Sequence, residues 1–395
     1  MTAPRVAFLV GHTDNRWIGG TNYITNLIRA ILSVPGRPLE PVILLPPGAS
    51  PAFLEALPEV KRIESDLIVG RSPSRFAAKL SERILGRNLP LEALLKKHGI
   101  SVLSHSPAPG RASRIPVISW VPDFQHRRLP GFFSEEEVAR RDKGARETIE
   151  RADRVLVSSH DALNDFGRFL PEAVSKARVL HFVSGLGEDN SVSSRAELTA
   201  RYGLTGPYLH LPNQFWKHKN HSVVIEALSL LKQKGKTATV VSTGHTEDYR
   251  HPEYFAALQN KIQQAGISID TEFKILGVVP YSDLRSLMHH SAGIINPSEF
   301  EGWSTTVEEG KSLGKLVILS DIPVHREQNP ERAKFFRADD AGALADHIGE
   351  ALASYSETQE NVHMAQATQR LEERYSTFAN NYVSLVKDLL AERQK

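Results

Sequence analysis

Short apolar runs alternate with amphipathic stretches along the whole chain. Ten runs are apolar enough to predict buried parallel strands, five in each half of the sequence: RVAFLV (5–10), PVILLP (41–46), ISVLSH (100–105), PVISWV (116–121), RVLVSS (154–159), YLHLP (208–212), ATVVST (238–243), FKILG (273–277), AGIIN (292–296) and LVILS (316–320). The stretches between them have helical periodicity: residues 22–32, 75–97, 135–152, 221–235 and 281–291.

This alternation of strands and helices predicts two doubly wound, Rossmann-like α/β domains. The segment GLGEDNSVSSRAEL (185–198) is rich in Gly, Ser and Asn and predicts the boundary. We therefore expect a first domain over 1–187, a linker over 188–206 and a second domain over 207–374. A last helix, at about 376–390 within the tail 375–395, follows the second domain's own pattern.

The amino-acid composition excludes several classes of site and disfavours one class of function. The 395 residues include no cysteine, which excludes disulfides, thiolate metal sites and cysteine nucleophiles. The 48 basic side chains nearly balance the 46 acidic ones, so a dedicated nucleic-acid binder is disfavoured. The first apolar run is too short for a signal peptide, and no later run approaches the length of a membrane span. We expect a cytoplasmic protein.

Ligands of open α/β sheets bind beyond the carboxyl ends of the strands, so the loops there are the first candidates for a site. In the loop after the first strand, Gly19 and Gly20 immediately precede a predicted helix. Glycines at this place let backbone N–H groups approach a phosphate or a sugar, although a plain turn has the same pattern. The pattern GxGxxG is absent, which disfavours a dinucleotide oxidoreductase.

The segment LPNQFWKHKNHSVVIEAL opens the second domain. Lys217 and Lys219 lie in a polar loop between a strand and a helix that begins near Asn220. A lysine at such a loop suits a diphosphate leaving group, and a solvated lysine is the alternative. A metal site at His218 and His221 is disfavoured, because no third ligand stands at a recognisable spacing.

Two further segments have alternative interpretations. VSSHDALNDF (157–166) is read as a strand end and a helix N-cap, because a catalytic triad is not built from consecutive residues. In WVPDFQHRRLPGFF, the residues Asp123, His126 and Arg127 follow a strand. They could supply a base for an incoming hydroxyl group or only form a turn.

The predicted helix over 75–97 carries Arg83, Arg87 and Lys96 among leucines. Such a helix could lie against an anionic membrane surface. The charged outer face of a packed helix is the favoured interpretation.

The segment SEFEGWSTTVEEG (298–310) contains two carboxylates eight positions apart, Glu301 and Glu309. A helix is predicted from near Thr305 to a C-terminal cap at Gly314. Thr305 with Glu308, or Thr306 with Glu309, fits a capping box. A cap does not account for Glu301, which lies in the preceding loop. A loop carboxylate can bind sugar hydroxyls while the amides at the helix start face a phosphate.

The same segment resembles the hallmark of the retaining GT-B glycosyltransferases of family 4, a pattern written PSxxEGFGxxxxEA. Here it runs from Pro297 to Glu309. Supporting matches are the glycine pair after the first strand, LGVVPYSDL before the hallmark and GKLVILSDIPVHREQ after it. The resemblance covers most of the chain and is strongest over 208–327.

The resemblance implies a role for each matching position. Glu301 would contact hydroxyls of the donor sugar, Glu309 the nucleotide ribose, and Lys219 the diphosphate. Further donor contacts would come from Gly19, Gly20, Gln214, Gly302, Trp303, Ser304 and Thr305. Gln214 stands where an arginine is common. Asp123 and His126 lie near the family's acceptor-side histidine and aspartate, although Pro122 occupies the place of that histidine.

The implied activity is that of a hexosyltransferase-type enzyme (EC 2.4) which takes a nucleotide-diphosphate sugar as donor and retains the anomeric configuration. The acceptor would be a hydroxyl of a glycan, a lipid-linked glycan or a small molecule, with no metal and no other cofactor. The terminal helix would cross back onto the first domain, and the protein could touch the inner membrane surface. The alternative is a non-transferase GT-B protein, such as a nucleotide-sugar epimerase or a binding module.

Overall fold

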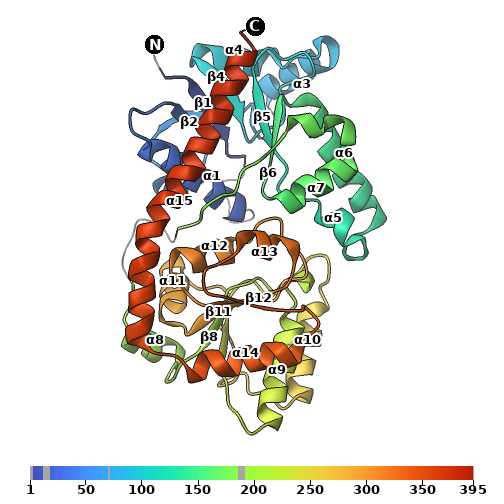
Figure 1. The fold of residues 1–395 in the computed structure, drawn as a ribbon. Helices are drawn as coiled ribbons and strands as arrows, with labels where there is room; N and C mark the ends of the chain where they lie inside the picture. The colour runs from blue at the N-terminus through green and yellow to red at the C-terminus, as the bar shows by residue number, and fades with distance from the viewer. Residues whose placement is uncertain (1–2, 12–17, 70–71, 186–191, 395) are drawn as a thin grey trace. The chain divides into compact units, whose positions relative to one another are not determined.

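The computed structural model describes residues 3–11, 18–69, 72–185 and 192–394. The chain divides into two compact units (Figure 1). The first comprises Met1–Arg127, Ser134–Val183 and Glu373–Lys395, and the second comprises Arg128–Phe133 and Ser184–Glu372.

The first unit is built on a seven-stranded, wholly parallel sheet with the order β3-β2-β1-β4-β5-β6-β7. The strands are β1 (Arg5–Leu9), β2 (Glu40–Leu45), β3 (Lys61–Glu64), β4 (Ile100–Ser104), β5 (Val117–Trp120), β6 (Arg154–Val157) and β7 (Ala177–Val179). The intervening helices are α1 (Ile18–Ser33), α2 (Pro51–Ala56), α3 (Pro73–Leu85), α4 (Leu89–Lys97), α5 (Gln125–Arg128), α6 (Glu135–Arg151) and α7 (His160–Phe169), with the 3₁₀ turn η3 (Pro171–Lys176). The 3₁₀ turn η2 (Pro130–Phe132) belongs to the second unit.

The second unit has a six-stranded parallel sheet with the order β10-β9-β8-β11-β12-β13. Its strands are β8 (Leu209–Leu211), β9 (Val240–Ser242), β10 (Phe273–Ile275), β11 (Gly293–Asn296), β12 (Val317–Ser320) and β13 (Ala333–Phe336). Its helices are α8 (Arg195–Tyr202), α9 (His221–Gln233), α10 (Tyr254–Gln264), α11 (Tyr281–His290), α12 (Thr305–Ser312), α13 (Pro323–Gln328) and α14 (Ala341–Ala353), with the 3₁₀ turn η4 (Lys217–Lys219).

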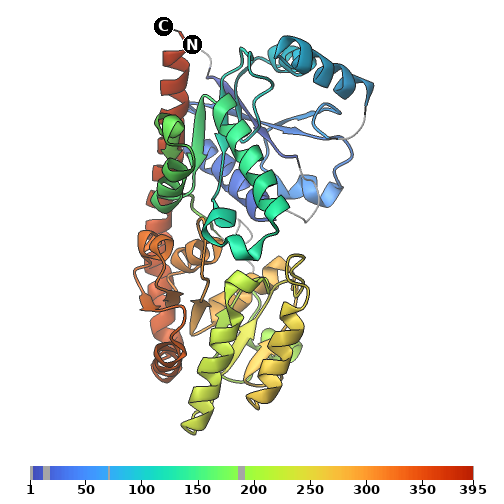
Figure 2. The same cartoon turned by 90° about the vertical axis from the view of Figure 1, so that its right-hand side faces the viewer.

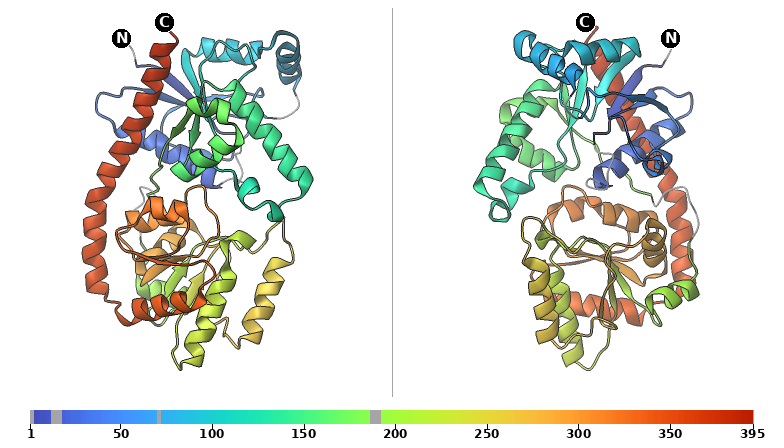
Figure 3. Two further views of the ribbon diagram at one scale, coloured as in Figure 1. Left: turned by 45° about the vertical axis from the view of Figure 1, so that its right-hand side comes forward. Right: turned by 180° about the vertical axis from the view of Figure 1, so that it is seen from behind.

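Helices cover both faces of the second sheet (Figures 1 and 3). On one face, α9, α10 and α14 pack on the strands through a cluster that includes Leu228, Leu258 and Ile348. On the other face, Met288 of α11 and Val307 of α12 pack against β11 and β12. A sheet covered on both faces must be apolar on both, which is why its strands read as continuous apolar runs rather than alternating ones.

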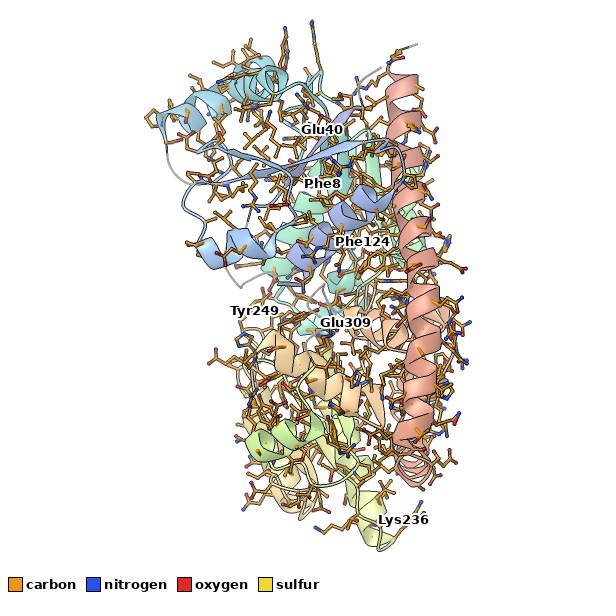
Figure 4. The ribbon with its side chains drawn as sticks, turned by 90° about the vertical axis from the view of Figure 1, so that its left-hand side faces the viewer. Phe8, Glu40, Phe124, Lys236, Tyr249 and Glu309 are labelled. Atoms are coloured by element: carbon orange, nitrogen blue, oxygen red, sulfur yellow. The ribbon has the colours of Figure 1, made fainter. Side chains whose placement is uncertain are left out.

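The last helix, α15, spans Glu357–Glu392 and is much longer than the sequence indicated. Its part up to Glu372 belongs to the second unit, where Glu360 accepts hydrogen bonds from buried Lys315 and from Arg332. Its part from Glu373 belongs to the first unit. There the Tyr382 hydroxyl donates to Ser104 Oγ at 2.6 Å, and its ring lies 5.7 Å from the ring of Phe8, which Figure 4 labels.

Two doubly wound parallel sheets were predicted and are found, and all ten predicted strands are present. The periodicity missed three edge strands, β3, β7 and β13. Only one residue of β3 is buried, so it lacks an apolar run. The predicted helix 75–97 is wrong as a single element, because Gly86 ends α3 in the left-handed conformation (φ 67°) before α4 begins. The helix α8 lies within the stretch predicted as linker.

Among the described residues, no helix combines the length and the apolar character needed to cross a bilayer.

Candidate active site

The second sheet reverses its direction of winding at β8. The chain runs from β8 through β9 to β10 and then returns to β11 on the other side of β8. Loops that leave the carboxyl ends of the two central strands diverge at such a switch point and leave room for a ligand. The loop 212–220 follows β8, and the loop 297–304 follows β11.

Lys219 and Glu301 meet at this switch point. The Nζ atom of Lys219, at the end of η4, lies 2.6 Å from Oε1 of Glu301. The two side chains are only 15% and 10% exposed, so the pair is shielded but can still be reached by a ligand. Burial raises the pKa of Glu301, but the charge and hydrogen bond of Lys219, together with smaller effects of His218 and His325, lower that pKa below its ordinary value. The Glu301 carboxylate is therefore ionised at neutral pH.

Buried polar side chains hold Glu301 in place. Ser298, which is fully buried, has its hydroxyl 2.7 Å from Oε1 of Glu301 and 2.7 Å from Oδ1 of Asn296. The same Asn296 oxygen accepts a hydrogen bond from Nδ2 of Asn213 at 3.2 Å. The network thus ties the loop after β8 to the loop after β11. Sequence reasoning missed Asn296 and Ser298, although a polar residue at the end of the apolar run AGIIN was an available signal.

The helix α12 begins at Thr305, as predicted, but its cap differs from both predicted capping boxes. The N-cap is Ser304, whose Oγ accepts from the amide of Val307 at 3.3 Å. The third helical residue is therefore Val307 and not a glutamate, so no capping box forms. The amides of Thr305 and Thr306 have no hydrogen-bond acceptor within the part of the chain that the structure describes. They are available to an anion at the helix start.

Gln328, at the end of α13, forms hydrogen bonds with the backbone at the start of α12. It accepts from the amide of Ser304 at 3.1 Å and donates to the Ser304 carbonyl at 3.0 Å. Its Nε2 is also 3.0 Å from a carboxylate oxygen of Glu308, which pairs in addition with Lys311. The predicted capping role of Glu308 is therefore wrong, because its carboxylate contacts Gln328 and Lys311 instead. The predicted C-terminal signal at Gly314 is confirmed, since Gly314 has φ 62° just after α12.

Glu309 lies in the middle of α12 (labelled in Figure 4) and is 6% exposed. Burial raises the pKa of its carboxyl to about 8, and a hydrogen bond with Ser184 opposes the shift. Glu301 and Glu309 thus differ in protonation at neutral pH, with Glu301 ionised beside its lysine and Glu309 protonated.

Three buried histidines surround the Lys219 loop. Burial lowers the pKa of His218 and of His221 to about 3 each, and His221 stacks on Phe215 at 4.2 Å between ring centroids. His325 of α13 was not singled out in the sequence. Its Nδ1 lies 2.9 Å from the Ser320 carbonyl, and burial lowers its pKa to about 4 while the nearby Glu301 carboxylate opposes that shift. All three rings are neutral at pH 7.

The other residues of this unit that were predicted to bind the donor lie in the same two loops. Gln214 lies in the loop after β8, partly buried, and Gly302 and Trp303 lie between Glu301 and the α12 cap, also partly buried. Gly244, with φ 136°, allows the loop after β9 to press on the loop of Gln214, because a Cβ there would lie 2.7 Å from the Asn213 carbonyl oxygen. The loop 212–220 is therefore held in a definite position.

In the first unit, the sheet has its own switch point between β1 and β4. Gly19 and Gly20 were expected just before a helix and instead lie in the first turn of α1, which begins at Ile18. Gly19 is exposed and Gly20 is buried. At the end of β4, His105 has a positive φ of 55°, and its ring nitrogens lie 2.8 Å from Ser104 Oγ and 3.0 Å from Tyr23 Oη. Sequence reasoning did not single out His105.

Asp123 and His126 lie in the loop and short helix after β5. Oδ1 of Asp123 accepts from the amide of Gln125 at 2.9 Å, which is the geometry of a turn-forming aspartate. His126 is buried, and its Nε2 lies 3.0 Å from Asp142, which Arg127 also contacts. Burial lowers the pKa of His126, and the hydrogen bond with Asp142 opposes the shift.

The segment 157–166 forms a strand end and a helix N-cap, as predicted. Ser159 caps α7 by accepting from the amide of Ala162 at 3.0 Å, directly after β6 ends.

Comparison with known protein families gives a match within the second unit. Residues 204–370 match the family model described as Glycosyl transferases group 1. This region contains the Lys219–Glu301 pair, α12 and Gln328. Among curated proteins, no relative matches the chain.

Three solved structures share the fold over nearly the full length of both chains. A glycosyltransferase from Rickettsia africae is 19% identical with a TM-score of 0.65, covering 100% of each chain. Anabaena HepE in complex with UDP and glucose is 15% identical with a TM-score of 0.66, and sucrose-phosphate synthase from Thermosynechococcus elongatus is 15% identical with a TM-score of 0.67. Each of these two covers 98% of this chain and 100% of its own. At such identities the likeness shows the fold alone. The protein has the GT-B fold, and its residues 204–370 match the model of the group 1 glycosyltransferases.

Proposed function

We propose that the protein transfers a sugar from a nucleotide-diphosphate sugar to a hydroxyl group of an acceptor, with retention of the anomeric configuration. The observation that carries the proposal is the Lys219–Glu301 pair at the carboxyl ends of β8 and β11, beside the start of α12. A cation, an ionised carboxylate and unpaired helix amides at one switch point match the diphosphate and the sugar hydroxyls of such a donor.

In the proposal, each group binds one part of the donor. The ammonium of Lys219 and the amides of Thr305 and Thr306 neutralise the diphosphate, and Glu301 accepts hydrogen bonds from sugar hydroxyls. Glu309 binds the ribose. Further contacts come from Gln214, Gly302, Trp303 and Ser304, and from Gly19 and Gly20 in the first unit. No metal is required for this neutralisation scheme.

The reaction then follows from charge placement. The bond between the anomeric carbon and the diphosphate oxygen breaks, and the leaving oxygen develops negative charge opposite Lys219. The acceptor hydroxyl attacks the oxocarbenium-like sugar on the face that the diphosphate leaves, and its proton passes to the departing phosphate oxygen. Preorganised positive charge lowers the barrier because it is already oriented when the charge develops.

The acceptor-side roles are proposed for Asp123 and His126. The hydrogen bond between His126 and Asp142 orients the imidazole, so we assign His126 to positioning and Asp123 to the acceptor hydroxyl. The acceptor class in the proposal is a glycan, a lipid-linked glycan or a small molecule. UDP-glucose is the first donor to test, because Anabaena HepE, which shares the fold, has been crystallised with it.

The test is transfer with a panel of nucleotide sugars, read by release of free nucleotide and by NMR of the anomeric proton of the product. We expect an acceptor-linked sugar with the donor's anomeric configuration. Lys219→Ala and Glu301→Gln should each lower kcat/KM by about a hundredfold or more. Lys234→Ala, at a lysine of the same unit that is 53% exposed, is the matched control and should have no effect.

Three outcomes would contradict the proposal. Binding of a nucleotide sugar without turnover would indicate a binding module. Interconversion of nucleotide sugars without an acceptor-linked product would indicate an epimerase. Inversion of the anomeric centre would refute the retaining mechanism.

A further inference from the structure

The helix α3 (Pro73–Leu85) presents its large apolar side chains outward. Phe76, Leu80 and Ile84 are 71%, 47% and 69% exposed. They are spaced four residues apart and so lie on one face of the helix. Leu85 and Leu89, at the end of α3 and the start of α4, are 54% and 39% exposed. We call the surface formed by these five side chains the outer α3 face. Figure 2 shows α3 and α4 as the blue helices at the upper right, at the margin of the first unit.

The opposite side of α3 attaches it to the unit through small and polar residues. Ala78 is the buried residue of the helix. Glu82 accepts from Arg151 of α6 at 2.9 Å, and the Ser81 hydroxyl accepts from the Leu89 amide at 3.2 Å. A packed amphipathic helix normally turns its apolar stripe to the core. In α3 the arrangement is reversed, so the apolar stripe is available to another surface.

Close backbone contacts hold the carboxyl end of α3 in place. Gly86 ends the helix, and its carbonyl accepts from the amide of Ala112 in the loop after β4 at 2.9 Å. Gly110 in the same loop approaches so closely that a Cβ there would lie 2.2 Å from the Gly86 oxygen. These contacts fix the orientation of the outer α3 face.

Basic side chains flank the apolar stripe. Lys79 and Arg83 each precede a member of the stripe by one position and form a second row along the same side of the helix. Residues 72–97 contain six basic and two acidic side chains. Both acids are paired with arginines, Glu82 with Arg151 and Glu92 with Arg87. Within the described residues, Lys79 and Arg83 have no ion-pair partner, so the row keeps its positive charge.

We propose that the outer α3 face docks the protein onto an anionic lipid surface. An apolar helix face beside a row of cations can insert shallowly between lipid headgroups while the cations bind their phosphates. A second copy of this chain is a poorer occupant. A two-fold contact through this face would bring Lys79 and Arg83 of one copy against the same cations of the other. The proposal does not depend on sugar transfer, because lipid binding is measured directly.

The test is flotation of the full chain with vesicles of phosphatidylcholine alone or mixed with phosphatidylglycerol. We expect binding to the mixed vesicles, weak binding to the neutral ones, and loss of binding as salt is raised. Lys79→Gln with Arg83→Gln should weaken binding about 30-fold. Phe76→Ser with Ile84→Ser should weaken it at least about tenfold. Ile269→Ser, which alters an isoleucine of the second unit that is 56% exposed, is the control and should bind normally.

Two results would overturn the proposal. The first is equal vesicle binding by the wild type and both double variants, with circular dichroism showing that all remain folded. The second is a concentration-dependent dimer in sedimentation that Phe76→Ser with Ile84→Ser abolishes, which would make a second copy the occupant.

Discussion

Breaking the Lys219–Glu301 pair tests stability and function in one set of variants. Lys219→Met leaves Glu301 as an unpaired carboxylate in a site where it is 10% exposed. Removing one partner of a fully buried pair costs about 3–5 kcal/mol. Because both side chains retain some exposure, we expect the lower end, about 3 kcal/mol, for the second unit. Glu301→Gln should cost a similar amount, because it leaves the ammonium of Lys219 unpaired.

The double variant Lys219→Met with Glu301→Gln removes both charges and should recover part of the loss. We expect a coupling free energy of about 2 kcal/mol for this pair. The control cycle uses Lys234 and Asp346, a pair 3.3 Å apart in the same unit whose side chains are 53% and 65% exposed. Its coupling should be about 0.5 kcal/mol or less. Urea unfolding followed by tryptophan fluorescence measures both cycles, since Trp216 and Trp303 lie in the second unit.

The pH dependence of the same variants has a defined sign. The pKa of Glu301 is lowered in the folded protein, so the pair stabilises above the ordinary carboxyl pKa, and this stabilisation is lost as the pH falls through the lower folded pKa. In Lys219→Met the raising effect of burial is no longer opposed by the lysine, so the pKa of Glu301 should rise. Acid should therefore protonate this carboxylate at a higher pH than in the wild type.

In the double variant, stability should partly recover but transfer activity should not. Transfer should stay at least about a hundredfold below that of the wild type although stability partly recovers, because the donor loses both of its charged contacts. Additive effects on stability would refute the coupling. Near-normal transfer by Lys219→Met would refute the role assigned to Lys219.

Four further predictions concern α12 and its surroundings. The raised pKa of Glu309, about 8, means that the folded state gains stability from the protonated carboxyl below the unfolded pKa and loses it as the pH rises through 8. Glu309→Gln should flatten this decline in unfolding measured from pH 6 to about 9. If the ribose donates two hydroxyls to ionised Glu309, nucleotide binding at pH 7 should release a proton. Calorimetry in buffers of different ionisation enthalpy would detect this release, and binding without proton release would exclude this binding mode. Ser304→Ala should cost about 1 kcal/mol by removing the α12 cap, with Ser304→Asp restoring most of it, and an unchanged unfolding midpoint would contradict the assignment. Gly314→Ala should lower the free energy of unfolding by more than about 1 kcal/mol, because φ is 62° and a Cβ would lie 2.5 Å from the His363 carbonyl oxygen. Gly206→Ala is the control and should melt like the wild type, because nothing lies within 4 Å of a Cβ there.

The sequence by itself determined ten of the thirteen described strands, their alternation with helices, and the position of the loop candidates. Buried parallel strands need apolar residues on both faces, so RVAFLV or LVILS is recognisable without any tertiary contact. The start of α12 and the glycine signal at Gly314 were likewise local, because each depends on residues within one or two turns. Glu301 could be singled out because no local cap explained it.

Only the tertiary structure decided which of these residues meet. Lys219 and Glu301 are 82 positions apart and come together because β8 and β11 are neighbours in the sheet, a pairing that the apolar pattern does not specify. Gln328 replaced the predicted glutamate at the start of α12, because a side chain from α13 reaches the Ser304 backbone there. The direction of α3 was also decided by packing. Amphipathic periodicity identifies an apolar face, but whether that face turns to the core or to the solvent depends on the anchoring contacts, which for α3 hold the polar side inward.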